Sequence, residues 1–276
     1  ALTASASVWG YLSLGILVDA AFPVLSSLTI GGVGVGQRMI SEYREKLQIK
    51  AMFGTYVSPK LVQRLVDDPS LMRLGGDTKT LSFLFCDIVG FTPISEHFAK
   101  KNDAQGLVSL INRLLSEMTD VVLSLDGTID KYMGDAVMAF WGAPVDFKNG
   151  EHERMAVNCA AKMLVALEKL NKQNEEDGLP IMGIGIGINT GPCVIGNMGG
   201  EKRFDYSAIG DAVNVAARLE SSTRKYVHNV LIGEATAKVV PDLVKHVDSI
   251  EVKGKSELLE VYTLSGQAIH EAHLAD

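Results

Sequence analysis

The sequence predicts an α+β fold built on a ferredoxin-like βαββαβ core, and three patterns lead to this prediction. Short apolar runs of strand length alternate with long helical patterns, two of the short runs meet at a Gly-Asp corner, and one run alternates strictly between apolar residues and glycine. The patterns follow one another in the order β-α-β-β-α-β. They occupy residues 80–87, 107–125, 127–133, 135–142, 152–174 and 181–190.

The run IMGIGIGINT at 181–190 shows the two-residue period of a strand most clearly. Its apolar residues fall on one face and Gly183, Gly185 and Gly187 on the other. Because glycine weakens a strand, we expect a helix or a second backbone to approach that face closely. An extra helix after Gly210 and strands near 247–253 and 258–264 complete the chain.

The first 36 residues are strongly apolar, and Asp19 is their one charged residue. No basic region precedes them, which argues against a signal peptide. Three alternatives remain open: one tilted membrane span, two spans that meet near Asp19 and Pro23, or a buried core helix. Four basic residues follow between Arg38 and Lys50, so the positive-inside rule places the rest of the chain in the cytoplasm. Because the sequence starts without methionine, we also expect a fragment or a processed piece.

The remaining organisation follows from local signals. Residues 37–50 have the pattern of a charged helix, too short for a firm coiled-coil prediction. Ser58-Pro59 is typical of a helix start. We therefore divide the chain into four parts: an apolar transmembrane segment at 1–36, a helical linker at 37–78, a catalytic domain at 79–265 and a carboxyl-terminal tail at 266–276.

Composition and missing motifs exclude several classes of function. The net charge is −7 and there is no basic stretch, so we expect no nucleic-acid partner. Cys86, Cys159 and Cys193 lie far apart among apolar neighbours, which indicates buried free thiols in a reducing compartment. Neither a dinucleotide-binding glycine motif nor a Walker-type phosphate loop is present.

Two aspartates are the strongest candidates for chemistry. Asp87 ends the first strand, and Asp135 lies at the tip of the central hairpin. The first strand and this hairpin are neighbours in a ferredoxin-like sheet, so both carboxylates should reach the same edge. Carboxylate oxygens suit magnesium, and two ions there could clamp phosphoryl oxygens. The backbone N–H groups of residues 88–92, which lead into a helix, could cradle phosphate.

Three motifs in this order and spacing, FLFCDIVGFT, DKYMGDAVMAFWG and YSAIGDAVNVAARLE, resemble the catalytic domain of class III nucleotidyl cyclases of the bacterial, membrane-attached type. The resemblance covers about Leu81 to Leu264. It implies that Asp87, Ile88 and Asp135 are metal ligands for two Mg²⁺ or Mn²⁺ ions per site.

The resemblance also implies substrate-binding residues. Lys131 matches the lysine that reads the adenine edge. Ser207 matches the second base-reading residue, where the family usually has Asp or Thr. Lys253 matches the lysine that reaches the β and γ phosphates, and Gly90, Phe91 and Thr92 belong to the phosphate-binding loop.

Two catalytic residues complete the set that the resemblance implies. Asn214 and Arg218 lie four residues apart on one helix face. They match the pair that orients the ribose and stabilises the transition-state phosphate.

The expected activity is that of an adenylate cyclase, which converts ATP to cyclic AMP and pyrophosphate at the interface of a homodimer. A guanylate cyclase is one alternative, although such members of the family carry Glu and Cys in place of Lys131 and Ser207. A diguanylate cyclase would need a GG[DE]EF hairpin, which is missing here. A catalytically inactive membrane scaffold is the other alternative. Loss of a catalytic residue would favour it, but both metal aspartates, Asn214 and Arg218 are present.

Overall fold

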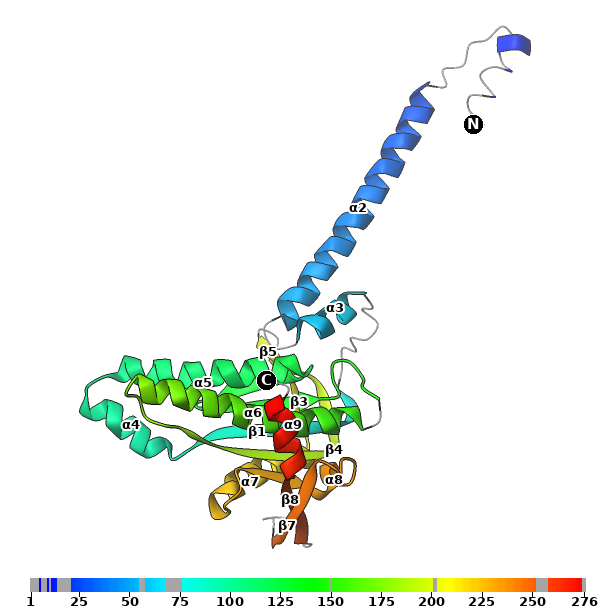
Figure 1. Ribbon diagram of the computed structural model, residues 1–276. Helices are drawn as coiled ribbons and strands as arrows, with labels where there is room; N and C mark the ends of the chain where they lie inside the picture. Colours follow the sequence, from blue (N-terminus) through cyan, green and yellow to red (C-terminus); the bar gives the residue numbers. More distant parts are fainter. Residues whose placement is uncertain are drawn as a thin grey trace. The chain divides into compact units, whose positions relative to one another are not determined.

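A computed structural model describes residues 5, 9, 11–13, 21–54, 58–67, 76–148, 150–200, 203–251 and 258–274 (Figure 1). The chain separates into two compact units, Ala1–Met52 and Phe53–Asp276. The second unit contains the sheet and the helices that cover it (Figure 1).

The predicted order of elements is confirmed in the second unit. The strands and helices of the predicted core begin and end within a few residues of the predicted positions, except for the run at 181–190, which is longer. The strand at 230–233 and the helices at 234–237 and 266–274 were not predicted. The elements are α3 (Pro59–Asp67), β1 (Asp77–Val89), α4 (Phe91–Lys100), α5 (Ala104–Ser124), β2 (Thr128–Met133), β3 (Ala136–Trp141), α6 (Glu151–Glu176), β4 (Gly183–Gly200), β5 (Arg203–Ile209), α7 (Asp211–Ser222), the 3₁₀ turn Thr223–Lys225, β6 (Val230–Gly233), α8 (Glu234–Ala237), β7 (Val244–Glu251), β8 (Leu258–Leu264) and α9 (Gly266–Leu274).

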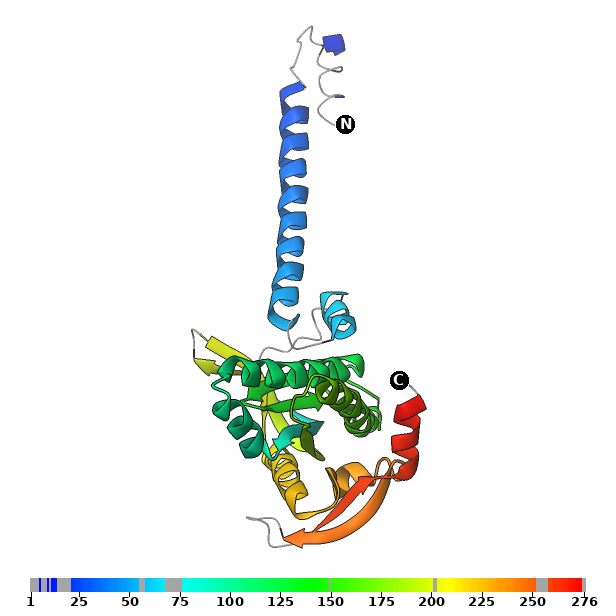
Figure 2. The same cartoon turned by 60° about the vertical axis from the view of Figure 1, so that its left-hand side comes forward.

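The eight strands form one mixed sheet in the order β2-β3-β1-β4-β6-β8-β7, with β5 paired to β4. The antiparallel pairs of β1 with β3 and with β4 give the predicted ferredoxin-like core. β4 is longer than the run predicted at 181–190, and its second half pairs with β5, which the sequence reading did not separate as a strand. These two strands extend past the rest of the sheet as an arm (Figure 2).

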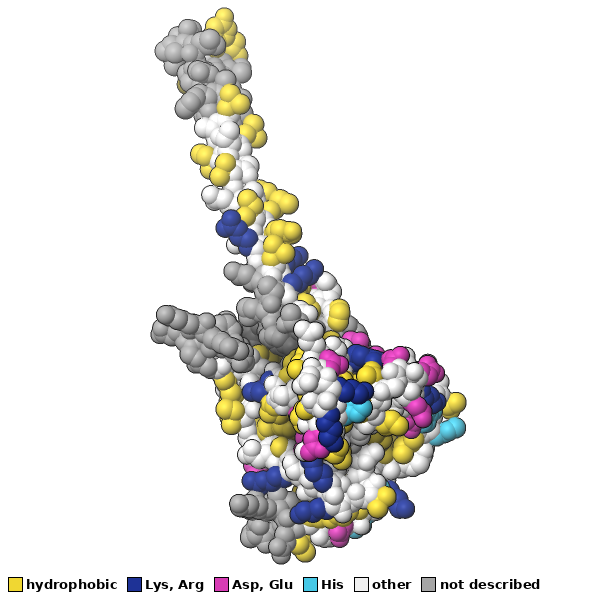
Figure 3. Space-filling model, turned by 90° about the vertical axis from the view of Figure 1, so that its left-hand side faces the viewer, with side chains coloured by type: hydrophobic (Ala, Val, Ile, Leu, Met, Phe, Trp, Pro, Cys, Tyr) yellow, Lys and Arg dark blue, Asp and Glu magenta, His cyan; other side chains and the backbone are white. Residues whose placement is uncertain are grey.

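The long helix α2 (Ala21–Phe53) contains the charged helix predicted at 37–50. Figure 3 shows hydrophobic side chains exposed along this helix, with Lys and Arg side chains toward its carboxyl-terminal half. Within the described ranges, no helix is both long and apolar enough to cross a membrane. The transmembrane segment predicted at 1–36 is therefore not found there, since the apolar part of α2 ends at Gly36 and charged residues follow from Arg38. Residues 1–4, 6–8, 10 and 14–20 of that segment lie outside the described residues.

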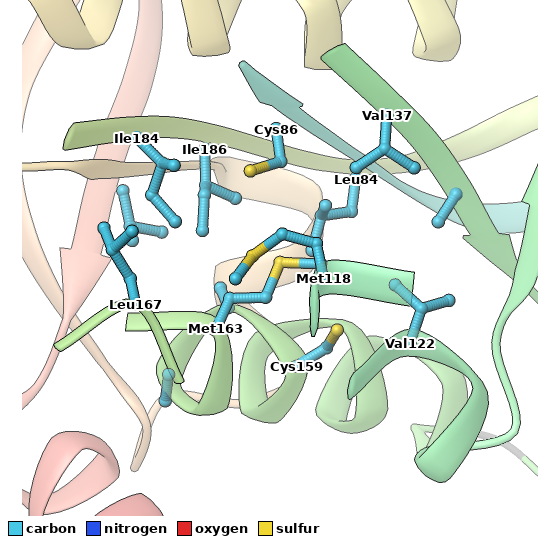
Figure 4. Close-up of a cluster of buried hydrophobic side chains, with 14 of the residues drawn as sticks. Leu84, Cys86, Met118, Val122, Val137, Cys159, Met163, Leu167, Ile184 and Ile186 are labelled. Atoms are coloured by element: carbon cyan, nitrogen blue, oxygen red, sulfur yellow. The ribbon is translucent and has the colours of Figure 1, made fainter. Parts of the chain in front are cut away.

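Alternating side chains of β1 contribute to two hydrophobic cores, one on each face of the sheet. Leu84 and Cys86 pack with residues of α5 and α6 on one face (Figure 4). Phe83 and Phe85 pack on the other face with a cluster that includes α7 residues. The three cysteines are free and buried, as predicted. Apolar burial on both faces is the main source of the free energy that holds the sheet together.

The glycine face of β4 confirms the predicted close approach. A Cβ atom on Gly187 would collide with the carbonyl oxygen of Ala216 and the backbone of Glu220, both in α7. One on Gly185 would collide with the Thr223 hydroxyl. Glycine at these positions therefore lets α7 lie directly on β4, which fixes the place of the polar residues that follow α7.

Candidate active site

The two predicted metal aspartates reach the same edge of the sheet. Cys86 of β1 pairs with Val137 of β3, so Asp87 lies beside the turn that joins β2 to β3. Asp135 lies in that turn after Gly134, whose φ of 70° is in the left-handed region that glycine tolerates. The predicted convergence of the two carboxylates is therefore present in one chain.

Among the described residues, Arg224 forms the ion pair at these two carboxylates. One Asp87 oxygen, Oδ1, accepts a hydrogen bond from the backbone N–H of Ile88 at 2.9 Å. The other, Oδ2, accepts from Arg224 Nη2 at 2.7 Å. Burial, followed by the charge of Asp87, raises the pKa of Asp135. The negative charge of the pair is thus only partly balanced by the described part of the chain.

Arg224 and Glu220 belong to this site, although the sequence reading missed them. Arg224 Nη1 lies 2.8 Å from Glu220 Oε1, and the Glu220 side chain is only 9% exposed. Burial raises the pKa of Glu220, while Arg224 opposes the shift. The four-residue spacing of Glu220 and Arg224 was a visible signal for a helical ion pair. We call Asp87, Asp135, Glu220 and Arg224 the Asp87 cluster.

The residues at this edge fit a divalent cation. Carboxylate oxygens are the ligands that Mg²⁺ prefers, and Asp87 and Asp135 offer them together. The side chain of Ile88 is buried and apolar, and its N–H is already donated, so its backbone carbonyl is the group it could offer. In the described residues, no group of three or more acidic, His or Cys side chains is arranged to hold a metal ion by itself. An ion here would therefore need substrate or water oxygens as well.

A second group of site residues forms around Lys131. The Lys131 ammonium lies 3.2 Å from Ser207 Oγ and 3.1 Å from Asp130 Oδ1. Ser207 Oγ in turn donates to the Asp130 carboxylate, at 2.9 Å from Oδ2 and 3.0 Å from Oδ1. The structure thus brings the two predicted base-reading residues together, and it adds Asp130, which the sequence reading missed. We call Asp130, Lys131 and Ser207 the Lys131 cluster.

The predicted phosphate-binding loop lies directly after Asp87 along the chain. Gly90 caps the amino end of α4 with a φ of 74°, and Phe91 and Thr92 form the first positions of that helix. The first N–H groups of a helix have no partner within it, so they can bind an anion. The residues predicted to bind phosphate thus follow the Asp87 end of β1 directly, at the amino end of a helix.

The structure does not bond the predicted catalytic residues Asn214 and Arg218 to the aspartates. Asn214 is exposed and Arg218 is half-buried on α7. In the part of the chain that the structure describes, no hydrogen bond or ion pair joins either side chain to Asp87 or Asp135. Lys253 lies outside the described residues. Asp211 is the first residue of α7, and Gly210 precedes it at the cap position.

Known proteins share this domain. Residues 76–266 match the family described as "Adenylate and Guanylate cyclase catalytic domain". Adenylate cyclase 1 of Rhizobium meliloti is 33% identical over 217 residues, which cover 78% of this chain and 32% of that protein. The adenylate cyclase of Anabaena cylindrica is 37% identical over 194 residues, which cover 67% of this chain and 36% of that protein. The chain therefore spans about a third of the length of these curated relatives.

Two solved structures show the same similarity at the level of the fold. The adenylyl cyclase CyaB from P. aeruginosa is 36% identical with a TM-score of 0.64, over 70% of this chain and 96% of that one. The guanylyl cyclase Cya2 is 32% identical with a TM-score of 0.63, over 70% and 95%. Because the two TM-scores are nearly equal, the fold does not decide between adenine and guanine as the purine of the substrate. The side chains that contact the purine must decide it.

Proposed function

The chain belongs to the adenylate and guanylate cyclase catalytic domain family, and from this premise we propose that it is an adenylate cyclase that converts ATP to 3′,5′-cyclic AMP and pyrophosphate. The observation that carries the choice of ATP is the Lys131 cluster, in which the Lys131 ammonium lies beside the Ser207 hydroxyl. Adenine N1 accepts a hydrogen bond, which an ammonium supplies. Adenine N6 donates one, which a hydroxyl oxygen accepts.

The reaction needs an in-line attack of the ribose 3′-oxygen on the α-phosphorus. The new 3′-O–P bond forms as the bond from the α-phosphorus to the bridging oxygen breaks, and pyrophosphate leaves. Asn214 would orient the ribose, and Arg218 would stabilise the charge that develops on the α-phosphate. The N–H groups at Gly90 to Thr92 and the Lys253 ammonium would bind the polyphosphate.

Asp87 and Asp135, with the Ile88 carbonyl, would hold divalent cations, which we propose to be two Mg²⁺ or Mn²⁺ ions per site. Bound ions would supply a more acidic 3′-hydroxyl and neutralise phosphoryl charge. The incompletely balanced charge of the two carboxylates supports this assignment, since burial and Asp87 together raise the pKa of Asp135.

We propose that each active site forms between two copies of the chain, so that a homodimer has two equivalent sites. One copy would provide Asp87 and Asp135, and the other Lys131, Ser207, Asn214 and Arg218. The lack of any hydrogen bond or ion pair between the aspartates and Asn214 or Arg218 among the described residues supports this arrangement.

We further propose that the amino-terminal segment attaches the protein to a membrane, with the catalytic domain in the cytoplasm. Large apolar side chains that are exposed on α2 support this proposal: Leu25, Leu28, Ile30, Val33 and Val35. Basic residues follow them from Arg38 onward. Extraction of membranes with detergent and with carbonate tests it, together with a truncated chain that starts at Ser58. If the full chain stays in the supernatant without detergent, the proposal fails.

Product analysis tests the proposed activity. Purified protein is incubated with ATP or GTP and Mg²⁺ or Mn²⁺, and the products are separated by chromatography. We expect cyclic AMP from ATP at a much higher kcat/KM than cyclic GMP from GTP. The Asp87→Ala variant is the control for contaminating cyclases. Equal kcat/KM for the two nucleotides, or no cyclic product from either, would refute the proposal.

A further inference from the structure

We infer that Asp130 is a specificity-determining positioning residue: it holds the Ser207 hydroxyl so that its oxygen accepts a hydrogen bond from the adenine amino group and its proton cannot be donated to guanine. The inference rests on the proposed function, because it concerns the purine of the nucleotide. It names Asp130 as the residue that sets the preference for adenine over guanine.

The backbone aims Asp130 into the protein. Ile129 pairs with Ala139 of β3 and Lys131 pairs with Met138, so Asp130 is an extra residue in β2, which makes a β-bulge. Bulges redirect a side chain and occur often beside active sites. The Asp130 side chain is 0% exposed. A carboxylate buried to this extent is costly unless several donors surround it.

Three donors surround the Asp130 carboxylate. The Ser207 hydroxyl lies 2.9 Å from Oδ2 and 3.0 Å from Oδ1. The Lys131 ammonium lies 3.1 Å from Oδ1, and the backbone N–H of Ala208 lies 3.3 Å from Oδ2. An ionised carboxylate can only accept hydrogen bonds. The single proton of the Ser207 hydroxyl must therefore point at Asp130.

A count of donors and acceptors shows what remains for a ligand. The Ser207 oxygen can accept two hydrogen bonds, and the Lys131 ammonium, at 3.2 Å, supplies one of them. One acceptor position on Ser207 stays open. The ammonium has three donors, of which Asp130 and Ser207 take two, so one donor stays open. The cluster thus presents one donor beside one acceptor.

This pattern complements adenine and opposes guanine. Adenine presents an acceptor at N1 and a donor at N6, whereas guanine presents a donor at N1 and an acceptor at O6. With its proton held by Asp130, Ser207 behaves as an acceptor, as a carboxylate would. Guanine would place its O6 acceptor against the Ser207 acceptor, and both oxygens would lack a donor. Such unpaired buried groups lower the affinity by about a factor of 10 to 100.

The decisive variant is Asp130→Asn in the full chain. The new amide can donate to Ser207 Oγ, which frees the hydroxyl proton for guanine O6, while the shape of the side chain is kept. We measure kcat/KM for ATP and GTP, and the affinity for 3′-deoxy-ATP and 3′-deoxy-GTP, which cannot cyclise. We expect the ATP-to-GTP ratio to fall by about tenfold or more in both measurements.

Two controls separate positioning from a structural role. In a Ser207→Ala background, Asp130→Asn should leave the ratio unchanged, because no hydroxyl remains to be oriented. Asp126→Asn is the matched control, since Asp126 also accepts a serine hydroxyl, that of Ser58 at 2.9 Å, outside the cluster. It should leave the ratio unchanged in the wild-type background. A merely structural Asp130 would lower both kcat/KM values equally.

The outcomes distinguish this inference from the proposed function. If the wild type prefers ATP and Asp130→Asn keeps the same ratio, the inference is overturned and the function stands. If the wild type does not prefer ATP, the proposed function fails first. If Asp130→Asn does not fold, the affinity of the wild type for two further nucleotide analogues tests the inference. The 3′-deoxyriboside triphosphate of 6-methoxypurine, which offers an acceptor at position 6, should bind about tenfold more weakly than that of unsubstituted purine. Equal or tighter binding would overturn the inference.

Discussion

The Asp87 cluster and the Lys131 cluster each place one basic side chain beside acidic ones, yet they differ in how well the carboxylates are paired. In the Lys131 cluster the fully buried Asp130 has three donors, so its hydrogen bonds are satisfied before any ligand arrives. In the Asp87 cluster Arg224 serves both Asp87 and Glu220, and the pKa of Asp135 is raised. In the proposed mechanism, the chain fixes the hydrogen bonds that read the purine before the nucleotide binds, and it leaves the charge of its aspartates to be balanced by metal ions.

The largest expected effect is on the Asp87 cluster. Asp87→Ala or Asp135→Ala should lower turnover by about a thousandfold or more. Each variant removes a carboxylate that would bind a metal ion, and the ions would neutralise the phosphoryl charge during the reaction. The thermal midpoint should stay close to that of the wild type, since both residues lie outside the core. Cyclic AMP production at saturating Mg²⁺ measures turnover. Asp242→Ala, which also removes an arginine-paired carboxylate, is the control and should keep full activity.

The second effect is on the Lys131 cluster and changes selectivity. Lys131→Glu together with Ser207→Cys should lower the ATP preference over GTP by about tenfold or more, because both hydrogen-bonding positions are reversed or removed. The ratio of the two kcat/KM values measures it. An unchanged ratio in a folded double variant would show that the base is read elsewhere.

The third effect is on stability. Arg224→Met should lower the free energy of unfolding by about 1–2 kcal/mol without metal, because Glu220 is mostly buried and would lose its partner. Divalent cations should then raise the thermal midpoint more than in the wild type. Arg154→Met is the matched control, since its pair with Asp242 is nearly half exposed and should contribute less to stability. Equal losses in the two variants would contradict the difference in burial.

The smallest effect concerns the repulsion between the two aspartates. Asp135→Asn should raise the free energy of unfolding without metal by a few tenths of a kcal/mol at most, roughly the size of an exposed charge interaction. Chemical denaturation in the presence of a chelator measures it. A clear loss of stability would mean that the chain already balances the charge of the Asp135 carboxylate, and the contrast between the two clusters would disappear.

Sequence reasoning predicted the core because its signals are local. The alternation at 181–190 and the Gly134-Asp135 corner each show their structure within a few residues. Asp130 and Arg224 were missed because their partners are distant: Asp130 and Ser207 are separated by 77 positions, and Arg224 and Asp87 by 137. The bulge that turns Asp130 inward is also invisible in the sequence, since it depends on how β2 pairs with β3.

The aspartates of one chain, in the proposed mechanism, work with the Lys131 cluster and Arg218 of another. Mixing Asp87→Ala protein with Arg218→Ala protein, each inactive alone, tests this most directly. If subunits exchange freely, about half of the dimers are mixed, and each mixed dimer has one intact site and one doubly damaged site. We expect about a quarter of the wild-type activity to return, since one site in four is then intact. No recovery, despite subunit exchange shown by a labelled partner, would contradict a site shared between two chains.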